Sequence, residues 1–179
     1  MTGNVEKPEV IGAYRHLQNY IGKKDKTHAI TFIPPAPEKV NELMDNLIDY
    51  INTPNDSFRP LVRIAIIHAQ FESIHPFMDG NGRVGRMLIP MYLYAKKQIE
   101  EPFFFISEAL EKDKIKYYTL LNNIRFKGEW DEWIKFFLEA VRSYRVTKFI
   151  NMDAFPVSAQ EAMKACSRLE RLIPMETGL

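Results

Sequence analysis

Residues 57–98, SFRPLVRIAIIHAQFESIHPFMDGNGRVGRMLIPMYLYAKKQ, decide the fold of this chain. Two apolar segments of helical length, residues 57–74 and 82–98, flank a stretch rich in glycine and charge. The part from Leu61 to Ile67 is apolar enough for a buried strand, but the length of the whole first segment favours a buried helix opened by Ser57 and Pro60. In the second segment, read as another buried helix, Pro90 is expected to cause a kink or mark a join.

Helical periodicity continues on both sides of this core segment. A stripe of apolar residues predicts a helix that ends near Asn52: Val40, Leu43, Met44, Leu47, Ile48 and Ile51. Ser107 is expected to cap a helical region through Asn123. Further amphipathic helices are predicted over Glu129–Val146 and Ser158–Leu172.

The N-terminal part carries the only extended pattern. Two short segments, Gln18–Ile21 and His28–Ile33, flank the polar run Gly22–Lys26, as expected for a β-hairpin with a five-residue loop. Pro34 ends the second segment. The predicted fold class is therefore all-α, a helical bundle with one small β-hairpin near residues 18–33.

Composition limits the class of protein. The chain has 179 residues, which is the size of one domain. Its 24 basic and 23 acidic side chains nearly cancel, so its net charge does not attract nucleic acid or anionic lipid. Its apolar runs are shorter than the ~20 residues of a membrane-spanning helix. One cysteine, Cys166, and no leader pattern at Met1 predict a cytoplasmic protein with neither nucleic-acid nor membrane partners.

Residues 75–86, HPFMDGNGRVGR, combine the side chains needed for phosphate chemistry. Gly80 and Gly82 allow backbone N–H groups to converge at the start of a helix, where the helix dipole favours an anion. Arg83 and Arg86 share one helix face and can grip a polyphosphate. Asp79 offers hard oxygen ligands to Mg²⁺, and His75 is the one base near neutrality.

A simpler pattern competes with this interpretation. GNGRVG fits the G-x-G-x-x-G dinucleotide fingerprint, but that fingerprint requires a preceding strand in a βαβ unit, which the sequence does not predict. A glycine-rich turn between helices would explain GNG alone, yet it does not explain so many polar groups between two apolar helices.

The same stretch resembles the signature of the Fic family, HPFx[D/E]GNGRxxR. It matches at nine specified positions: His75, Pro76, Phe77, Asp79, Gly80, Asn81, Gly82, Arg83 and Arg86. Tyr14-Arg15, Phe32-Ile-Pro-Pro35, Arg125 and Gly128-Glu-Trp130 are also similar to the family. The resemblance implies a Fic domain over residues 1–150, followed by a linker and helix over 151–179 that resembles the start of a further domain in longer relatives.

The resemblance implies a role for each matched residue. His75 is the catalytic base and Asp79 binds Mg²⁺, while Asn81 holds an α-phosphate oxygen. The residues assigned to the nucleotide are Phe77, Gly80, Asn81, Gly82, Arg83, Arg86, Tyr117 and Tyr118, with the two tyrosines near the adenine. The hairpin at residues 18–33, called the flap below, aligns a target protein along His28–Ile33.

The activity implied is transfer of AMP from ATP to a Ser, Thr or Tyr hydroxyl of a protein, with the enzyme itself as one acceptor to test. Alternatives are transfer of UMP, a phosphotransferase, whose relatives resemble HxFxDANKR instead, and a noncatalytic nucleotide-binding module. The inhibitory pattern [S/T]xxxE[G/N] of many relatives is matched only in part, by residues 2–7.

Overall fold

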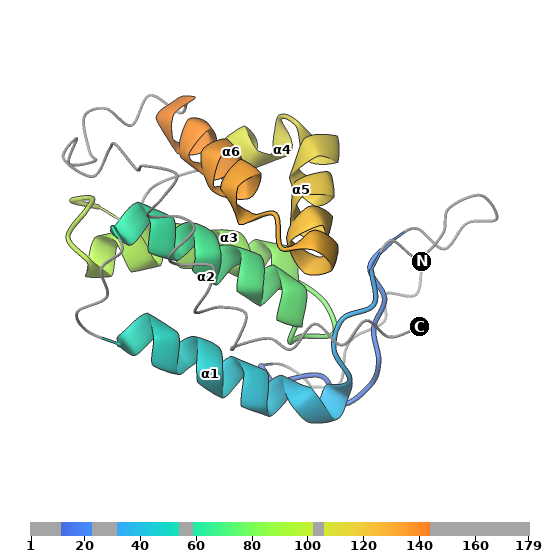
Figure 1. Ribbon diagram of the computed structural model, residues 1–179. Helices are drawn as coiled ribbons and strands as arrows, with labels where there is room; N and C mark the ends of the chain where they lie inside the picture. The colour runs from blue at the N-terminus through green and yellow to red at the C-terminus, as the bar shows by residue number, and fades with distance from the viewer. Residues whose placement is uncertain (1–11, 23–31, 54–58, 102–105, 144–179) are drawn as a thin grey trace, which may run out of the picture.

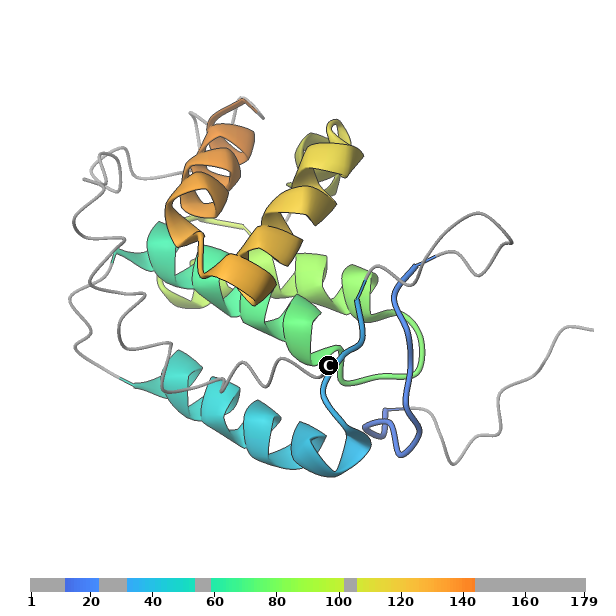
Figure 2. The ribbon, with the colours of Figure 1, turned by 45° about the vertical axis from the view of Figure 1, so that its right-hand side comes forward.

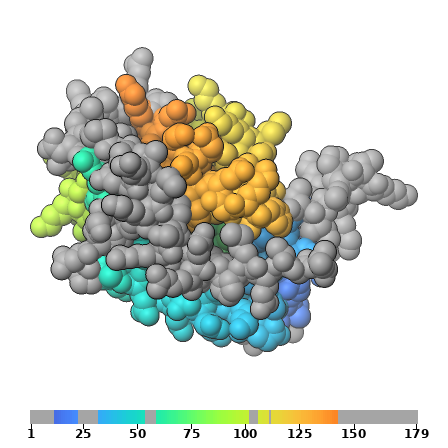
Figure 3. All heavy atoms as spheres, in the orientation of Figure 1, coloured from blue at the N-terminus to red at the C-terminus, as the bar shows by residue number. Residues whose placement is uncertain are grey.

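A computed structural model of the chain describes residues 12–22, 32–53, 59–101 and 106–143. These residues form six α-helices and one short 3-10 helix, and the all-α prediction is confirmed. The helices make three layers: α2 and α3 run side by side through the middle, α1 covers one side, and α4 to α6 cover the other (Figures 1 and 2). In the space-filling view, α1 borders one edge of the visible face and α6 lies toward the opposite edge (Figure 3).

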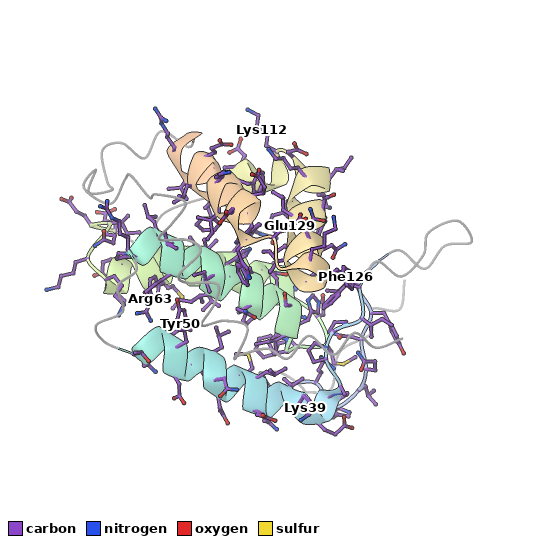
Figure 4. All side chains as sticks on the ribbon, in the orientation of Figure 1. Lys39, Tyr50, Arg63, Lys112, Phe126 and Glu129 are labelled. Carbon is purple, nitrogen blue, oxygen red and sulfur yellow. The ribbon has the colours of Figure 1, made fainter. Side chains whose placement is uncertain are left out.

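Helix α1, Val40–Asn52, has the predicted bounds and follows the 3-10 turn Pro37–Lys39. Its buried side chains are Val40, Leu43, Met44 and Leu47, but Ile48 of the predicted stripe is exposed. Arg63 of α2 ties the end of α1 to the central layer. Its guanidinium donates to the carbonyls of Tyr50 and Thr53 and lies 4.7 Å from the Tyr50 ring centre (Figure 4).

Helix α2, Pro60–Ile74, is a buried helix, and the alternative of a strand at Leu61–Ile67 is wrong. Nearly every residue is buried because α1, α3 and α6 pack around it. Pro60 occupies the first turn, where no backbone N–H is needed, and Arg59 is the N-cap. Ser57, the predicted cap, lies outside the described residues.

Helix α3, Asn81–Ala95, begins one residue earlier and ends three residues earlier than predicted, and it runs through Pro90 without a join. The prediction that it is buried all round is wrong. Its buried face consists of Asn81, Gly85, Ile89, Tyr92 and Leu93, whereas Met87, Met91 and Tyr94 are exposed. Apolar composition gave no information about which side would contact α2.

The helical region predicted from Ser107 to Asn123 consists of two helices, and the prediction that Ser107 is its cap is wrong. Helix α4 is Ile106–Glu111 and already includes Ser107, whereas α5 is Lys114–Lys127. The cap is Asp113, whose carboxylate accepts a hydrogen bond from the Lys116 N–H at 3.0 Å. Asp113 thereby satisfies a donor that has no partner within the helix.

Helix α6, Trp130–Ser143, supplies aromatic anchors to the core between α2 and α5. Trp133 is fully buried, donates from Nε1 to the Ala65 carbonyl at 3.0 Å and stacks on His68. His68 joins three helices, because Nδ1 contacts the Gly85 carbonyl and Nε2 the Tyr117 hydroxyl, both at 2.9 Å. A carbonyl only accepts, so Nδ1 carries the proton and Tyr117 donates to Nε2.

The flap is described only at its ends. Ile21 and Phe32 form an antiparallel bridge with N···O distances of 3.0 and 3.2 Å, while residues 23–31 lie outside the described residues. The predicted hairpin therefore remains a prediction. The same holds for the predicted helix at Ser158–Leu172 and the domain boundary at residue 150. Within the described residues, no helix combines the length and hydropathy needed to cross a bilayer.

Candidate active site

His75 lies at the end of α2, where the backbone leaves the helix. It is the C-cap and has a left-handed backbone with φ of 52°, while its N–H donates to the Phe71 carbonyl at 2.9 Å. A residue other than glycine in this region is uncommon and costs on the order of 1–3 kcal/mol, and such residues cluster at functional sites. The left-handed turn separates the imidazole from α2 and starts the loop that leads into α3.

The environment of His75 keeps its imidazole neutral. Burial lowers the pKa of His75 to about 4, aided by the nearby charges of Arg125 and Arg15 and opposed by the Glu72 carbonyl and Asp79. Nδ1 is buried and lies outside ordinary hydrogen-bond geometry with the described residues. Because Nδ1 is enclosed by the protein, Nε2 is the ring nitrogen left for contact with a ligand.

An NMR titration should show this lowered pKa directly. The imidazole resonance that disappears in the His75→Ala variant should titrate with a midpoint near 4 in the nucleotide-free protein, because burial penalises the imidazolium. Above that pH the folded protein keeps His75 neutral, so the base is available at pH 7. A midpoint near the ordinary value of about 6.5 would show that water reaches the ring freely.

The N-terminus of α3 forms the opposite wall of the loop. Gly80 is the N-cap and has a φ of 81°, and the first helical hydrogen bond runs from the Val84 N–H to the Gly80 carbonyl at 3.0 Å. The earlier N–H groups of such a helix have no intrahelical acceptor and point outward, at the positive end of the helix dipole. This end of α3 is suited to bind a phosphate.

The side chain of Asn81 stabilises the loop between α2 and α3. It is buried, with Oδ1 accepting from the Phe77 N–H at 2.8 Å and Nδ2 donating to the Phe77 carbonyl at 2.7 Å. Phe77 in turn packs against Phe71 and Tyr14. Phe77 therefore packs inward and anchors the loop, and Asn81 holds it there, while the contact of either residue with a nucleotide remains a prediction.

Both arginines turn back toward the glycines of the loop. A Cβ placed on Gly80 would lie 3.3 Å from Nη2 of Arg83, and one placed on Gly82 would lie 3.1 Å from Nη1 of Arg86. The absence of side chains at the two glycines therefore leaves space in which the guanidinium groups approach the backbone. The grip of the two arginines on a polyphosphate, which their spacing predicts, remains a prediction.

Asp79 stands on the outer rim of the loop. Its Oδ1 accepts from the Gly80 N–H at 2.6 Å, and Oδ2 lies 3.6 Å from Nη2 of Arg83, with both side chains more than three-quarters exposed. An exposed ion pair of this kind contributes little stability, so either partner can turn toward a ligand. The carboxylate fits Mg²⁺ held jointly with phosphate oxygens, which is how proteins usually bind this ion.

The two tyrosines predicted near the adenine lie in different environments. Tyr117 is buried with its hydroxyl on His68, whereas Tyr118 is 42% exposed. Their rings meet edge to face at 5.1 Å. The ring of Tyr118 is thus accessible to a nucleobase, and the buried ring of Tyr117 packs against it from the protein interior.

Two polar residues, Arg15 just before the flap and Asn19 within it, make contacts with the loop that the sequence did not predict. The guanidinium of buried Arg15 donates to the carbonyls of Ile74 and His75, at 3.3 and 2.9 Å, and to that of Pro35. Asn19 donates from Nδ2 to the Phe77 carbonyl at 3.1 Å. Arg15 satisfies the last carbonyls of α2, which would otherwise lack partners. In the sequence, Arg15 is distinguished only by its place in the family resemblance.

Glu72 is a further missed residue, and it explains Gly85. Its carboxyl is buried beside α3, and burial raises its pKa while the charges of Arg125 and Arg86 lower it. A Cβ on Gly85 would lie 2.4 Å from Oε1 of Glu72 and 3.1 Å from the Phe71 ring. Glycine is therefore required where α2 and α3 meet. The sequence signal that could have identified Glu72 is the presence of an acidic residue within so apolar a helix.

Replacing Gly85 with alanine should destabilise the protein by about 1–3 kcal/mol, the usual cost of overpacking, although alanine favours helix. Urea denaturation measures this loss. The matched control is Gly82→Ala, whose Cβ would meet only the mobile end of Arg86. Equal stability of the Gly85→Ala and wild-type proteins would show that Glu72 can move aside freely.

Comparison with known proteins identifies the family of the chain. The sequence model of the Fic/DOC family matches residues 4–93, about half of the chain. The chain is 30% identical to a probable protein adenylyltransferase of Aquifex aeolicus, covering 74% of this chain and 47% of that protein. It is 36% identical to protein adenylyltransferase fic-1 of Caenorhabditis briggsae, covering 51% of this chain and 16% of that protein.

A solved structure shares the fold. The crystal structure of a Fic family protein from Desulfovibrio desulfuricans G20 superposes with a TM-score of 0.65 at 24% identity, covering 89% of this chain and 53% of that one. The chain thus spans about half or less of the length of these relatives. The family match, the helical fold and the loop between α2 and α3 together show that the chain belongs to the Fic/DOC family.

Proposed function

We propose that this chain is a protein adenylyltransferase that moves AMP from ATP to a protein hydroxyl. The observation that carries the proposal is the placement of two groups at the two ends of one loop. A neutral imidazole lies at the end of α2, and a helix N-terminus suited to bind an anion begins α3 only six residues later in the sequence. A base and a phosphate cradle on one loop are the two elements that such a transfer requires. The names of the relatives support AMP as the transferred group.

The chemistry follows from the position of each group. A Ser, Thr or Tyr hydroxyl attacks the α-phosphorus of ATP, and Nε2 of His75 takes its proton as the new O–P bond forms. The bond from the α-phosphorus to the bridging oxygen breaks, and pyrophosphate leaves. Arg83 and Arg86 stabilise the charge that develops on the leaving group, and the N–H groups of α3 hold the α- and β-phosphates.

Magnesium would be held by Asp79 together with the phosphate oxygens, and it would neutralise charge on the leaving pyrophosphate. Tyr118 would contact the adenine with its exposed ring. The flap would present the target segment, because an extended peptide can pair with the edge of a strand, which the sequence predicts at His28–Ile33. The cytoplasm remains the proposed location.

Labelled ATP tests the proposal and separates it from its alternatives. With magnesium present, label at the α-phosphate should appear on protein, with release of free pyrophosphate, whereas label at the γ-phosphate should not. Transfer of the γ-label would identify a phosphotransferase, and preferential labelling from α-labelled UTP would identify a uridylyltransferase. No label on any protein, in a preparation that binds ATP, would support the noncatalytic module.

A further inference from the structure

Arg125, near the end of α5, occupies a junction outside the nucleotide loop. Its guanidinium is largely buried between α5, the end of α2 and the flap. Burial lowers its pKa to about 10, with Glu72, Tyr117 and Tyr118 acting in the opposite direction, so the group remains a cation at neutral pH. A buried cation at a junction between three elements requires partners on each of them.

The edge of the guanidinium is bound to the helices. Nε donates to the Ser73 hydroxyl at 3.1 Å, Nη2 to the Glu72 carbonyl at 2.9 Å and Nη1 to Asn122 at 3.0 Å. The first two partners lie two and three residues before His75. The orientation of the guanidinium plane is therefore fixed by the same helix end that carries the imidazole.

The face of the guanidinium is turned to the flap. Cζ of Arg125 lies 3.9 Å from the ring centre of Phe32, close enough for a cation–π contact. Phe32 is the residue whose backbone pairs with Ile21 to join the two ends of the flap. The next residue, Phe126, meets the Phe32 ring edge to face at 6.3 Å, and Figure 4 shows it beside the flap at the end of α5.

The flap is thus fixed on two sides. Asn19 attaches its first end, and Arg15 the residues just before it, to the backbone of residues 74–77, whereas Arg125 supports Phe32 at its second end from α5. Both attachments end on the segment that carries His75. The positions of Asn19 and Phe32 relative to His75 are therefore set by side-chain contacts as well as by the course of the chain.

We propose that Arg125 is a positioning residue that holds Phe32, at the base of the flap, in place relative to His75, so that an acceptor hydroxyl presented by the flap reaches the imidazole. It acts through Phe32 and touches neither nucleotide nor acceptor. As an inference about acceptor docking it rests on the proposed AMP transfer, but its structural part, the support of the flap by α5, stands independently.

The decisive variants separate the effect of the Arg125 charge from that of the stacking of its planar group on Phe32. Arg125→Lys keeps the cation but loses the flat face and the fork of donors, while Phe32→Leu removes the ring and leaves Arg125 intact. Phe32→Tyr keeps the ring and should retain wild-type protection of the Ile21 and Phe32 amides. Arg142→Lys, on the exposed end of α6, is the matched arginine control.

Hydrogen exchange at the amides of Ile21 and Phe32 tests the structural part. Each of the two disruptive variants should lower protection by about 2- to 30-fold, the range that corresponds to a contact of ~0.5–2 kcal/mol. The double variant should lose no more than the larger single effect, because both changes remove one shared contact. Unchanged protection in both single variants, or strictly additive losses, would overturn the proposal.

The catalytic part uses the proteins that the wild type labels with α-labelled ATP. Arg125→Lys and Phe32→Leu should lower protein-bound AMP by the same factor, while ATP affinity and the slow release of free AMP to water stay unchanged. A parallel loss of ATP affinity would make Arg125 a nucleotide contact and reject the positioning role. If the wild type labels nothing, the proposed function fails, and the exchange experiment still decides whether Arg125 supports the flap.

Discussion

The His75→Ala variant should lose roughly 10²- to 10⁴-fold in the rate of AMP transfer, the usual contribution of a general base. Its affinity for ATP should remain, because the phosphates are assigned to the α3 N-terminus, Arg83 and Arg86 rather than to the imidazole. Initial rates with α-labelled ATP and a direct ATP-binding measurement give the two quantities separately.

The left-handed backbone at His75 calls for a second variant, because alanine is strained at a φ of 52°. His75→Asn is the matched change, since asparagine tolerates this conformation and has no basic nitrogen. Both variants should lose activity alike, but His75→Asn should be the more stable in urea. Undiminished transfer in His75→Asn would show that another group removes the proton.

Replacing Trp133 with alanine should lower the free energy of unfolding by about 3–5 kcal/mol, the largest stability effect expected in this chain. The side chain is 0% exposed, packs among His68, Tyr117 and Phe137, and donates its indole proton to the Ala65 carbonyl at 3.0 Å. The variant therefore loses apolar burial and a hydrogen bond together, and leaves that carbonyl without its donor.

Urea denaturation followed by circular dichroism measures the effect. Trp133→Phe should recover part of the stability, because the smaller ring fills much of the space but cannot donate to Ala65. Ile115→Ala, on a side chain that is 83% exposed, is the control and should change stability by less than about 0.5 kcal/mol. A loss below 1 kcal/mol in Trp133→Ala would mean that the core collapses into the cavity at little cost.

The sequence by itself determined the helical class, the position of the loop and the identity of its polar residues. These features are local: apolar residues at helical spacing predict α1, and the spacing of Arg83 and Arg86 places them on one face with the glycines before them. The family resemblance could be recognised because its signature is contiguous in the chain. The role of each residue in catalysis remains a prediction.

Local sequence patterns did not predict the environment of a residue where two similar residues have different neighbours in the fold. Tyr117 and Tyr118 are adjacent and were predicted alike, yet one hydroxyl is buried on His68 and the other ring is exposed. Ser107 was a good candidate cap, but Asp113 is the residue whose carboxylate meets a free N–H. The environments of the two tyrosines depend on how α5 is rotated against α2, which no local spacing encodes. The cap depends instead on where α4 ends and α5 begins.

Only the tertiary structure decided what surrounds His75. The contacts of Arg15 with the His75 carbonyl and of Arg125 with the Glu72 carbonyl join residues 60 and 53 positions apart. Such contacts arise from the packing of whole helices, which is driven by apolar burial and does not specify in the sequence which polar groups meet. The burial that lowers the pKa of His75 has the same origin, since desolvation depends on neighbouring elements rather than on neighbouring residues.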